Sequence, residues 1–309
     1  MNFVDNLGIL QICCYEQNIE KPTAIDSLNN EQRALRRAIN EVHVDVCGMR
    51  DWWFLEDSAV LQTKGVSNGS SATTSGSSTD DRTVTIGGGD APFPTGSYAA
   101  SEGRLTIAYG PSQHQSEPMR VTATSATEAD IVSEWHRGSN ATASGWVYGQ
   151  DRYRLDARAE RVKWVIGFRS GSGESYRMLD PLPYQSIEES RAQRANYLFA
   201  SAPAHYCVLG HERETSGDAM NSMTRVMVLD PFPDTDMTIW YGFIREPANL
   251  DVDSVVGLDV PEEYANIVAA LAQRTYLGTY GEGSHANSAI AAKSAQARMQ
   301  ELEGEAGES

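Results

Sequence analysis

The chain has 309 residues, of which 40% are hydrophobic and 22% charged, so it is long enough for one large domain or two ordinary ones with a packed core. Its formal net charge of −17 argues against a general nucleic-acid binder, because such a protein presents a basic surface to the phosphates. The charged residues are unevenly distributed along the chain. Acidic residues outnumber basic ones in residues 195–309, whereas residues 151–194 carry slightly more basic than acidic residues. We interpret the acidic excess as a solubilising surface.

The cysteines and the hydropathy of the chain indicate the cellular compartment in which the protein is made. Cys13, Cys14, Cys47 and Cys207 form no Cys-x-x-Cys pair, and the adjacent Cys13 and Cys14 cannot bridge each other without strain. This usage predicts a reducing environment. The sequence shows no secretory leader and no apolar run of membrane-span length, so we expect a protein that is made in a cytoplasm and has no membrane partner.

Residues 1–64 are predicted to hold two helices and an aromatic segment. Apolar residues at three- and four-residue steps predict a short helix over residues 3–16. A second, longer helix begins at Asn29, which can form a capping box with Gln32, and runs to about Arg50. The residues on its apolar side, continued into the aromatic segment, are expected to form the core of a helical bundle: Leu35, Ile39, Val42, Val46 and Trp53.

The character of the chain changes in residues 65–150. Residues 67–80 are almost entirely Ser, Gly, Thr, Asn and Ala and are expected to be a flexible tip, and short β-branched runs follow them. This segment is predicted to be an enlarged β insert. Residues 151–258 are predicted to be a second β region, in which Met178–Pro183 and Val228–Pro233 end in a Pro-x-Pro pattern typical of edge strands.

Aromatic and basic side chains recur along these β segments. Four tryptophans are expected in the sheet core, with a sugar-stacking platform as the alternative: Trp135, Trp146, Trp164 and Trp240. Four arginines could contact DNA or an acidic neighbouring subunit: Arg152, Arg154, Arg158 and Arg161. Because they alternate with apolar residues, a solvated strand face explains them equally well.

Residues 259–283 are predicted to contain the closing helix of the bundle. It begins at Pro261, and two acids occupy its first turn. Its apolar side includes Tyr264, Ile267 and Leu271. Residues 284–309 form an alanine-rich, acidic tail that would be marginal as an isolated helix. The expected fold is therefore α+β: N- and C-terminal helices in a small bundle, a large antiparallel β-sandwich-like insert, and an extended C-terminal tail.

The order of these elements resembles the head-to-tail adaptor (connector) proteins of tailed phages. The resemblance lies in five sequence segments: Leu35–Glu41 leading to Trp52–Leu55, the Pro-x-x-Tyr strand Pro203–Gly210, Leu229–Pro233, Trp240–Pro247, and Val260–Tyr264. The similarity covers roughly residues 1–64 and 160–280 and leaves the insert at 65–150 unassigned.

The resemblance implies a structural virion protein that is not an enzyme and needs no cofactor or metal. It implies a ring, usually of twelve copies, at the neck of the virion, docked on the portal protein and carrying a tail or nozzle protein. DNA would pass through an acidic channel without specific binding. The tail would dock on the portal through five residues: Ile290, Lys293, Arg298, Met299 and Leu302.

Histidine is the usual general base, and the sequence contains six histidines. His43 lies near the apolar side of the long helix, which favours a packing role over a catalytic one. His205, Cys207 and His211 are close enough to suggest a metal site, but three such residues in one segment occur often by chance. The sequence contains no Gly-x-Ser-x-Gly elbow, and no lysine follows Gly87–Asp90 as in a phosphate loop. Two other functions are alternatives to the adaptor. One is another virion structural protein, such as a tail-completion or head-decoration protein, and the other is a carbohydrate-active or lytic enzyme.

Overall fold

The computed structural model describes residues 5–75, 83–93, 102–109, 114–115, 118–131, 140–150, 152–169, 175–194, 198–213, 223–250 and 257–280. The chain divides into two compact units. The helical unit comprises Met1–Glu56 and Ile244–Ser309, and the β unit comprises Asp57–Phe243. The mixed α+β class is confirmed, and the β unit is inserted in sequence between the two halves of the helical unit.

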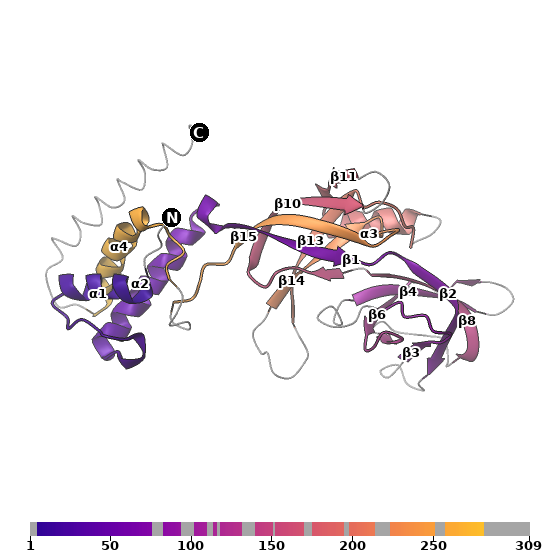
Figure 1. The fold of residues 1–309 in the computed structure, drawn as a ribbon, viewed down its shortest axis with the longest axis horizontal. Coiled ribbons are helices and arrows are strands. Elements are labelled where there is room, and N and C mark those ends of the chain that lie inside the picture. The colour runs from indigo at the N-terminus through magenta and orange to yellow at the C-terminus, as the bar shows by residue number, and fades with distance from the viewer. Residues whose placement is uncertain are drawn as a thin grey trace. The chain divides into compact units, whose positions relative to one another are not determined.

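Three α-helices and two short 3-10 helices make up the described part of the helical unit (Figure 1): α1 (Asn6–Glu16), η1 (Ile25–Ser27), α2 (Asn30–Gly48), η2 (Trp53–Leu55) and α4 (Glu262–Tyr280). The predicted capping box of α2 is confirmed. The Asn29 side chain accepts a hydrogen bond from the backbone N–H of Gln32 at 2.9 Å, and the Gln32 side chain accepts one from the N–H of Asn29 at 2.8 Å.

One hydrophobic cluster joins α1, α2, the aromatic segment and α4. Six of the residues predicted for this core are buried in it: Leu35, Ile39, Val42, Val46, Tyr264 and Ile267. Leu271 is half-buried and packs against the cluster. Residues that are distant in sequence therefore share one core.

The prediction for Trp53 is wrong. Its side chain is 50% exposed, whereas that of Trp52 is 1% exposed. The Trp52 ring stacks on Phe54 with centroids 5.3 Å apart, and its indole N–H donates to the Val46 carbonyl at 2.6 Å. Trp53 follows the helical spacing of the apolar residues, but α2 ends at Gly48, so the spacing no longer determines which side chains face the core.

Two four-stranded sheets of the β unit share one hydrophobic cluster. The first has the order β1 (Glu56–Thr63), β15 (Met237–Arg245), β10 (Ala159–Arg169) and β11 (Ser175–Met178). The second has the order β12 (Asp180–Pro181), β13 (His205–Arg213), β14 (Met223–Asp230) and β9 (Arg152–Arg154). The cluster includes Ile239 and Tyr241 from the first sheet and Tyr206 and Met227 from the second. Helix α3 (Tyr184–Gln193) lies between β12 and β13 in sequence.

The remaining strands close into a six-stranded antiparallel barrel. Their order is β4 (Glu102–Tyr109), β6 (Met119–Ala123), β7 (Glu128–Ile131), β3 (Thr83–Ile86), β2 (Ser67–Ser75) and β8 (Asn140–Gln150), and β8 pairs back to β4. The two-residue β5 (His114–Gln115) extends the pairing of β4. A core that includes Phe93, Trp146 and Tyr148 fills the barrel.

This barrel changes two expectations for the insert. The pairing of residues 67–150 is closed rather than sandwich-like. Residues 67–75 were expected to be part of a flexible tip, but they form β2, which pairs with β3 on one side and β8 on the other. Ala72 and Thr74 of this strand are buried, because barrel closure supplies backbone partners that the local composition does not reveal.

Candidate functional site

A buried charged cluster lies between α3 and β14 of the β unit. Arg191 of α3 is completely buried and pairs with Asp230 at 3.4 Å and Glu188 at 3.2 Å. Its guanidinium also donates to the Leu229 carbonyl at 2.8 Å and lies 4.2 Å from the centre of the Phe232 ring. Arg194 adds a second ion pair to Asp230, at 2.7 Å. The buried carboxylate of Asp230 thus has two cationic partners, and these offset the free-energy cost of removing its charge from water.

The cluster continues to the barrel. The Tyr184 hydroxyl at the start of α3 accepts hydrogen bonds from Arg104 of β4 at 3.3 Å and Arg120 of β6 at 3.4 Å. Arg104 also lies 3.6 Å from Glu188. Helix α3 therefore links two barrel strands to β14, and a role in holding the β unit together accounts for the arrangement.

The helical unit contains a second buried polar group, centred on His43 and Asp259. His43 Nε2 accepts the backbone N–H of Asp259 at 3.1 Å, and the Asp259 carboxylate pairs with Arg245 at 2.6 Å. Burial lowers the pKa of His43; the nearby Asp259 carboxylate opposes this shift, and Arg245 adds to it. Cys47 lies one turn further along α2, but burial raises its pKa to about 12, so the thiolate that a nucleophile requires is suppressed. This geometry favours packing over catalysis.

The residues considered for metal binding do not converge with further ligands in the part of the chain that is described. His205 and Cys207 lie two residues apart on β13, and the described residues contain no group of three or more His, Cys, Asp or Glu that could hold a metal ion. All four cysteines are free thiols. Within the same described ranges, no helix is both long and apolar enough to cross a membrane.

The four arginines that were considered together are separated by the fold. Arg152 is buried and Arg154 half-buried on β9, which pairs with β14. Arg158 follows that strand and is exposed; it pairs with Asp156 at 3.1 Å and with Asp57 at 3.4 Å. Its hydrogen bonds lower the pKa of Asp156. Arg161 is exposed on β10. They do not form the single strand face that was one of the alternatives.

The outer side of the β1–β15–β10–β11 sheet is unusually aromatic. Trp240 of β15 is 48% exposed, although its neighbours Ile239 and Tyr241 are buried in the cluster between the sheets. Strand alternation therefore places Trp240 on the opposite, outer side. Its ring contacts Phe168 of β10, with centroids 5.0 Å apart. The prediction that Trp240 lies in the core is wrong, whereas Trp146 is buried in the barrel as expected.

Neighbouring strands extend this surface. Val60 of β1 is 53% exposed, while the next residue, Leu61, is buried in the cluster. Met178 of β11 is 62% exposed and pairs in register with Ile166 of β10. The Trp164 indole lies where a side chain at position 242 would project, so position 242 must be glycine for this packing. We call this surface the aromatic face, and it comprises Val60, Trp164, Ile166, Phe168, Met178 and Trp240.

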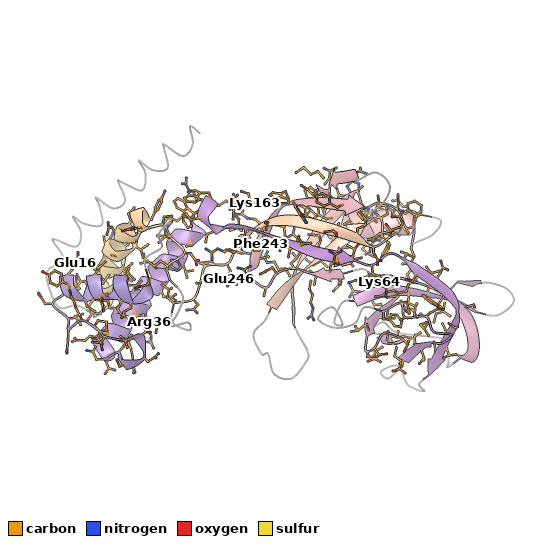
Figure 2. All side chains as sticks on the ribbon, in the orientation of Figure 1. Glu16, Arg36, Lys64, Lys163, Phe243 and Glu246 are labelled. Atoms are coloured by element: carbon orange, nitrogen blue, oxygen red, sulfur yellow. The ribbon has the colours of Figure 1, made fainter. Side chains whose placement is uncertain are left out.

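A sequence signal for the aromatic face exists. An antiparallel sheet with one solvated side alternates apolar and polar residues. The runs Trp164–Phe168 and Ile239–Ile244 contain no charged side chain and consist of aliphatic and aromatic residues and glycine, and they occur on strands that are adjacent in the sheet. Figure 2 shows Lys163 on β10 and Phe243 on the adjacent strand β15. Both runs therefore indicate a sheet that is apolar on its two sides.

The five residues predicted to dock on the portal, Ile290, Lys293, Arg298, Met299 and Leu302, lie outside the described residues. Comparison with known proteins gives no family model and no curated protein that matches the chain.

Proposed function

We propose that the chain is a head-to-tail adaptor of a tailed phage, a structural protein that forms a ring on the portal and carries the tail. The observation that supports this most is the shared core of the helical unit. The segments that resemble the adaptors at the two ends of the sequence, the long helix with its aromatic segment and the Val260–Tyr264 helix start, pack into one cluster. A shared core of this kind is required if those sequence segments belong to one adaptor-like unit.

The finer architecture follows from the same proposal. The three helices form the bundle of the ring wall, the two four-stranded sheets form its sandwich-like part, and the barrel of residues 67–150 is an addition to the adaptor pattern. Residues 284–309 form the extended tail that docks on the portal, through the five residues predicted from the sequence. The net charge of −17 suits a channel wall that passes DNA without holding it.

The polar clusters also suit a structural role. Two buried pairs among the described residues, Arg191 with Asp230 and His43 with Asp259, are engaged with each other and with backbone groups. A catalytic acid or base would need access to substrate. The exposed Trp240 ring, in contact with the half-buried Phe168, is the observation that favours the carbohydrate-active alternative, since sugars stack on exposed aromatic rings.

The test is the assembly state of the full-length chain, alone and co-expressed with the portal protein encoded in the same genome. Native mass spectrometry and electron microscopy should give a ring of about twelve copies seated on the portal. A chain that stays monomeric in the presence of portal contradicts the proposal, and turnover of glycan or peptidoglycan supports the enzyme instead.

Truncation tests the tail. Removal of residues 284–309 should abolish portal binding while the far-ultraviolet circular dichroism of the folded units is retained. The matched control is removal of residues 303–309 alone, which takes away acidic residues but leaves the five docking residues in place. Portal binding by the longer truncation at the wild-type level contradicts the docking role.

A further inference from the structure

We infer that residues 246–250 form a strap along α2 whose first half opens when the buried imidazole of His43 takes up a proton. The strap begins where β15 ends and belongs to the helical unit. Figure 2 labels Glu246 at the start of the strap and Arg36 on α2. The inference goes beyond the adaptor proposal and does not depend on it, because it concerns a response of the helical unit itself to acid.

A polar ridge on α2 holds the far end of the strap. Arg36, Asn40 and His43 follow one another at steps of four and three residues, so they share one side of the helix. Arg36 donates to the Leu250 carbonyl, and the Asn40 side chain accepts the Leu250 N–H at 2.8 Å. The Leu250 side chain is completely buried in the core of the unit. A guanidinium and an amide therefore hold this end, and neither takes up a proton in mild acid.

The near end of the strap is held through His43. The Asp259 carboxylate uses its two oxygens differently: Oδ1 pairs with Arg245 at 2.6 Å, and Oδ2 accepts the backbone N–H of Ala248 at 2.6 Å. The backbone N–H of Asp259 donates in turn to Nε2 of His43 at 3.1 Å. The neutral imidazole thus positions Asp259, and Asp259 holds Ala248.

Protonation at Nε2 of His43 reverses this contact. Nε2 then carries a hydrogen and can no longer accept the Asp259 N–H, so two donors face each other. Oδ2 of Asp259 lies 3.8 Å from Nε2, which is too long for a hydrogen bond. Asp259 must move for its carboxylate to reach the imidazolium, and the oxygen that moves is the one that holds Ala248. We therefore expect the hydrogen bonds of the Ala248 and Asp259 amides to open together.

The surroundings of His43 set the direction of the response. The side chain is completely buried, and this burial lowers its pKa; the Asp259 carboxylate opposes the shift, Arg245 adds to it, and the Ala248 backbone opposes it. Among the described residues, Asp259 and Arg245 are the charged groups that act on the imidazole. Cys47, one turn further along α2, stays a neutral thiol because burial raises its pKa to about 12. The open form therefore takes up the proton first as the pH falls below 6.5, the ordinary pKa of histidine.

Hydrogen exchange at single amides of the wild-type, full-length chain tests the opening. Rates measured by mass spectrometry with electron-transfer fragmentation at about pH 7, 6 and 5 are divided by the intrinsic rate at each pH. Protection of the Ala248 and Asp259 amides should fall by about tenfold or more between pH 7 and 5, since one pH unit of linkage is worth at most about tenfold. The Leu250 amide should remain about tenfold better protected at pH 5 than that of Ala248. Unchanged protection at Ala248 overturns the inference.

Low urea separates local opening from unfolding of the whole unit. Local opening exposes little surface, so exchange of the Ala248 amide at pH 5 should not depend on urea well below the unfolding transition. Amides in the middle of α2, such as that of Ile39, should exchange faster as urea is added. An equal urea dependence at Ala248 and Ile39 would mean that Ala248 exchanges through global unfolding, and it overturns the strap.

The matched variants are His43→Gln and His205→Gln in the full-length chain. Glutamine at position 43 keeps an acceptor for the Asp259 N–H but does not titrate, so the protection of Ala248 should be the same at pH 5 and pH 7. His205→Gln removes an imidazole from β13 and should leave the fall at Ala248 unchanged. A wild-type fall at Ala248 in His43→Gln overturns the role of His43.

Asn40→Ala tests the other end of the strap and stays informative if His43→Gln folds poorly. It removes the acceptor of the Leu250 N–H, so the protection of Leu250 should fall by about tenfold at pH 7 and pH 5 alike. The pH-dependent fall at Ala248 should remain. Equal loss of protection at Ala248 and Leu250 at pH 7 would show that the strap opens as a whole, which overturns the separate opening of its first half.

Discussion

Among the described residues of the helical unit, the buried carboxylate and imidazole are those of Asp259 and His43, and Arg245 completes the group from a half-buried position. The rest of that core is aliphatic, aromatic or thiol. In the β unit, a complete guanidinium group, that of Arg191, lies in the interior with Asp230. The helical unit thus buries an imidazole, which can become neutral, beside the Asp259–Arg245 pair, whereas the β unit buries a guanidinium, which cannot.

This difference predicts different sensitivities. A neutral imidazole needs no counter-charge, so the helical unit depends mainly on apolar packing and on pH. A buried guanidinium cannot lose its proton, so the β unit depends on the presence of both members of the pair. Mutations and pH should therefore act on the two units in distinct ways.

The largest expected effect is on the apolar core of the helical unit. Trp52→Ala should lower the free energy of unfolding by about 3–5 kcal/mol, because it removes a fully buried ring and the hydrogen bond that its indole N–H donates to the Val46 carbonyl. Trp53→Ala, the adjacent control, should cost about 1 kcal/mol because half of that side chain is exposed. Urea unfolding followed by circular dichroism measures both. Equal losses at the two positions would show that the burial of Trp52 is misassigned.

The next effect concerns the ion pair of the β unit. Asp230→Ala leaves the buried Arg191 with Glu188 as its remaining carboxylate partner among the ion pairs described, so we expect a loss of about 3 kcal/mol. Arg158→Ala breaks ion pairs with Asp156 and Asp57 at the surface and should cost less than about 1 kcal/mol. Chemical unfolding of the two variants, compared with wild type, tests whether burial or mere ion pairing matters. Similar losses would mean that the interior pair is worth no more than the surface one.

The predictions from sequence succeeded where the signal was local. The capping box at Asn29 and the apolar side of α2 follow from spacings of three and four residues, which a helix imposes directly. The same reasoning failed at Trp53 because the periodicity holds only while the helix continues. The position of the chain after Gly48 is set by packing on α4, more than two hundred residues away.

The β unit was less predictable because its determinants are far apart in sequence. Residues 67–75 become a strand through pairing with β3 and β8, not through their own composition. The burial of Arg191 depends on Asp230, and the exposure of Trp240 depends on which side of its sheet is covered by the other. The apolar runs on β10 and β15 did contain the relevant signal, but it was interpreted as core alone.

The pH dependence separates the units further. Burial lowers the pKa of His43 in the folded protein below its ordinary value of 6.5, so the unfolded chain takes up a proton first as the pH falls. Stability is therefore full above about pH 6.5 and declines below it, by at most about 1.4 kcal/mol per pH unit from this residue. His43→Gln removes the titrating group and should flatten that part of the profile between about pH 6.5 and 5. A wild-type profile identical in slope to that of His43→Gln would show that the imidazole is not buried as described.

The smallest effect tests the most local prediction. Asn29→Ala removes the acceptor for the Gln32 N–H at the start of α2 and should destabilise the helical unit by about 1 kcal/mol. Asn30→Ala, one residue further along, is the control: it is the first helical residue, it is exposed, and alanine is a better helix former there. Thermal unfolding should rank Asn29→Ala below wild type and leave Asn30→Ala at or slightly above it. Because the capping box acts within four residues, this loss should appear in the helical unit and leave the unfolding of the β unit unchanged.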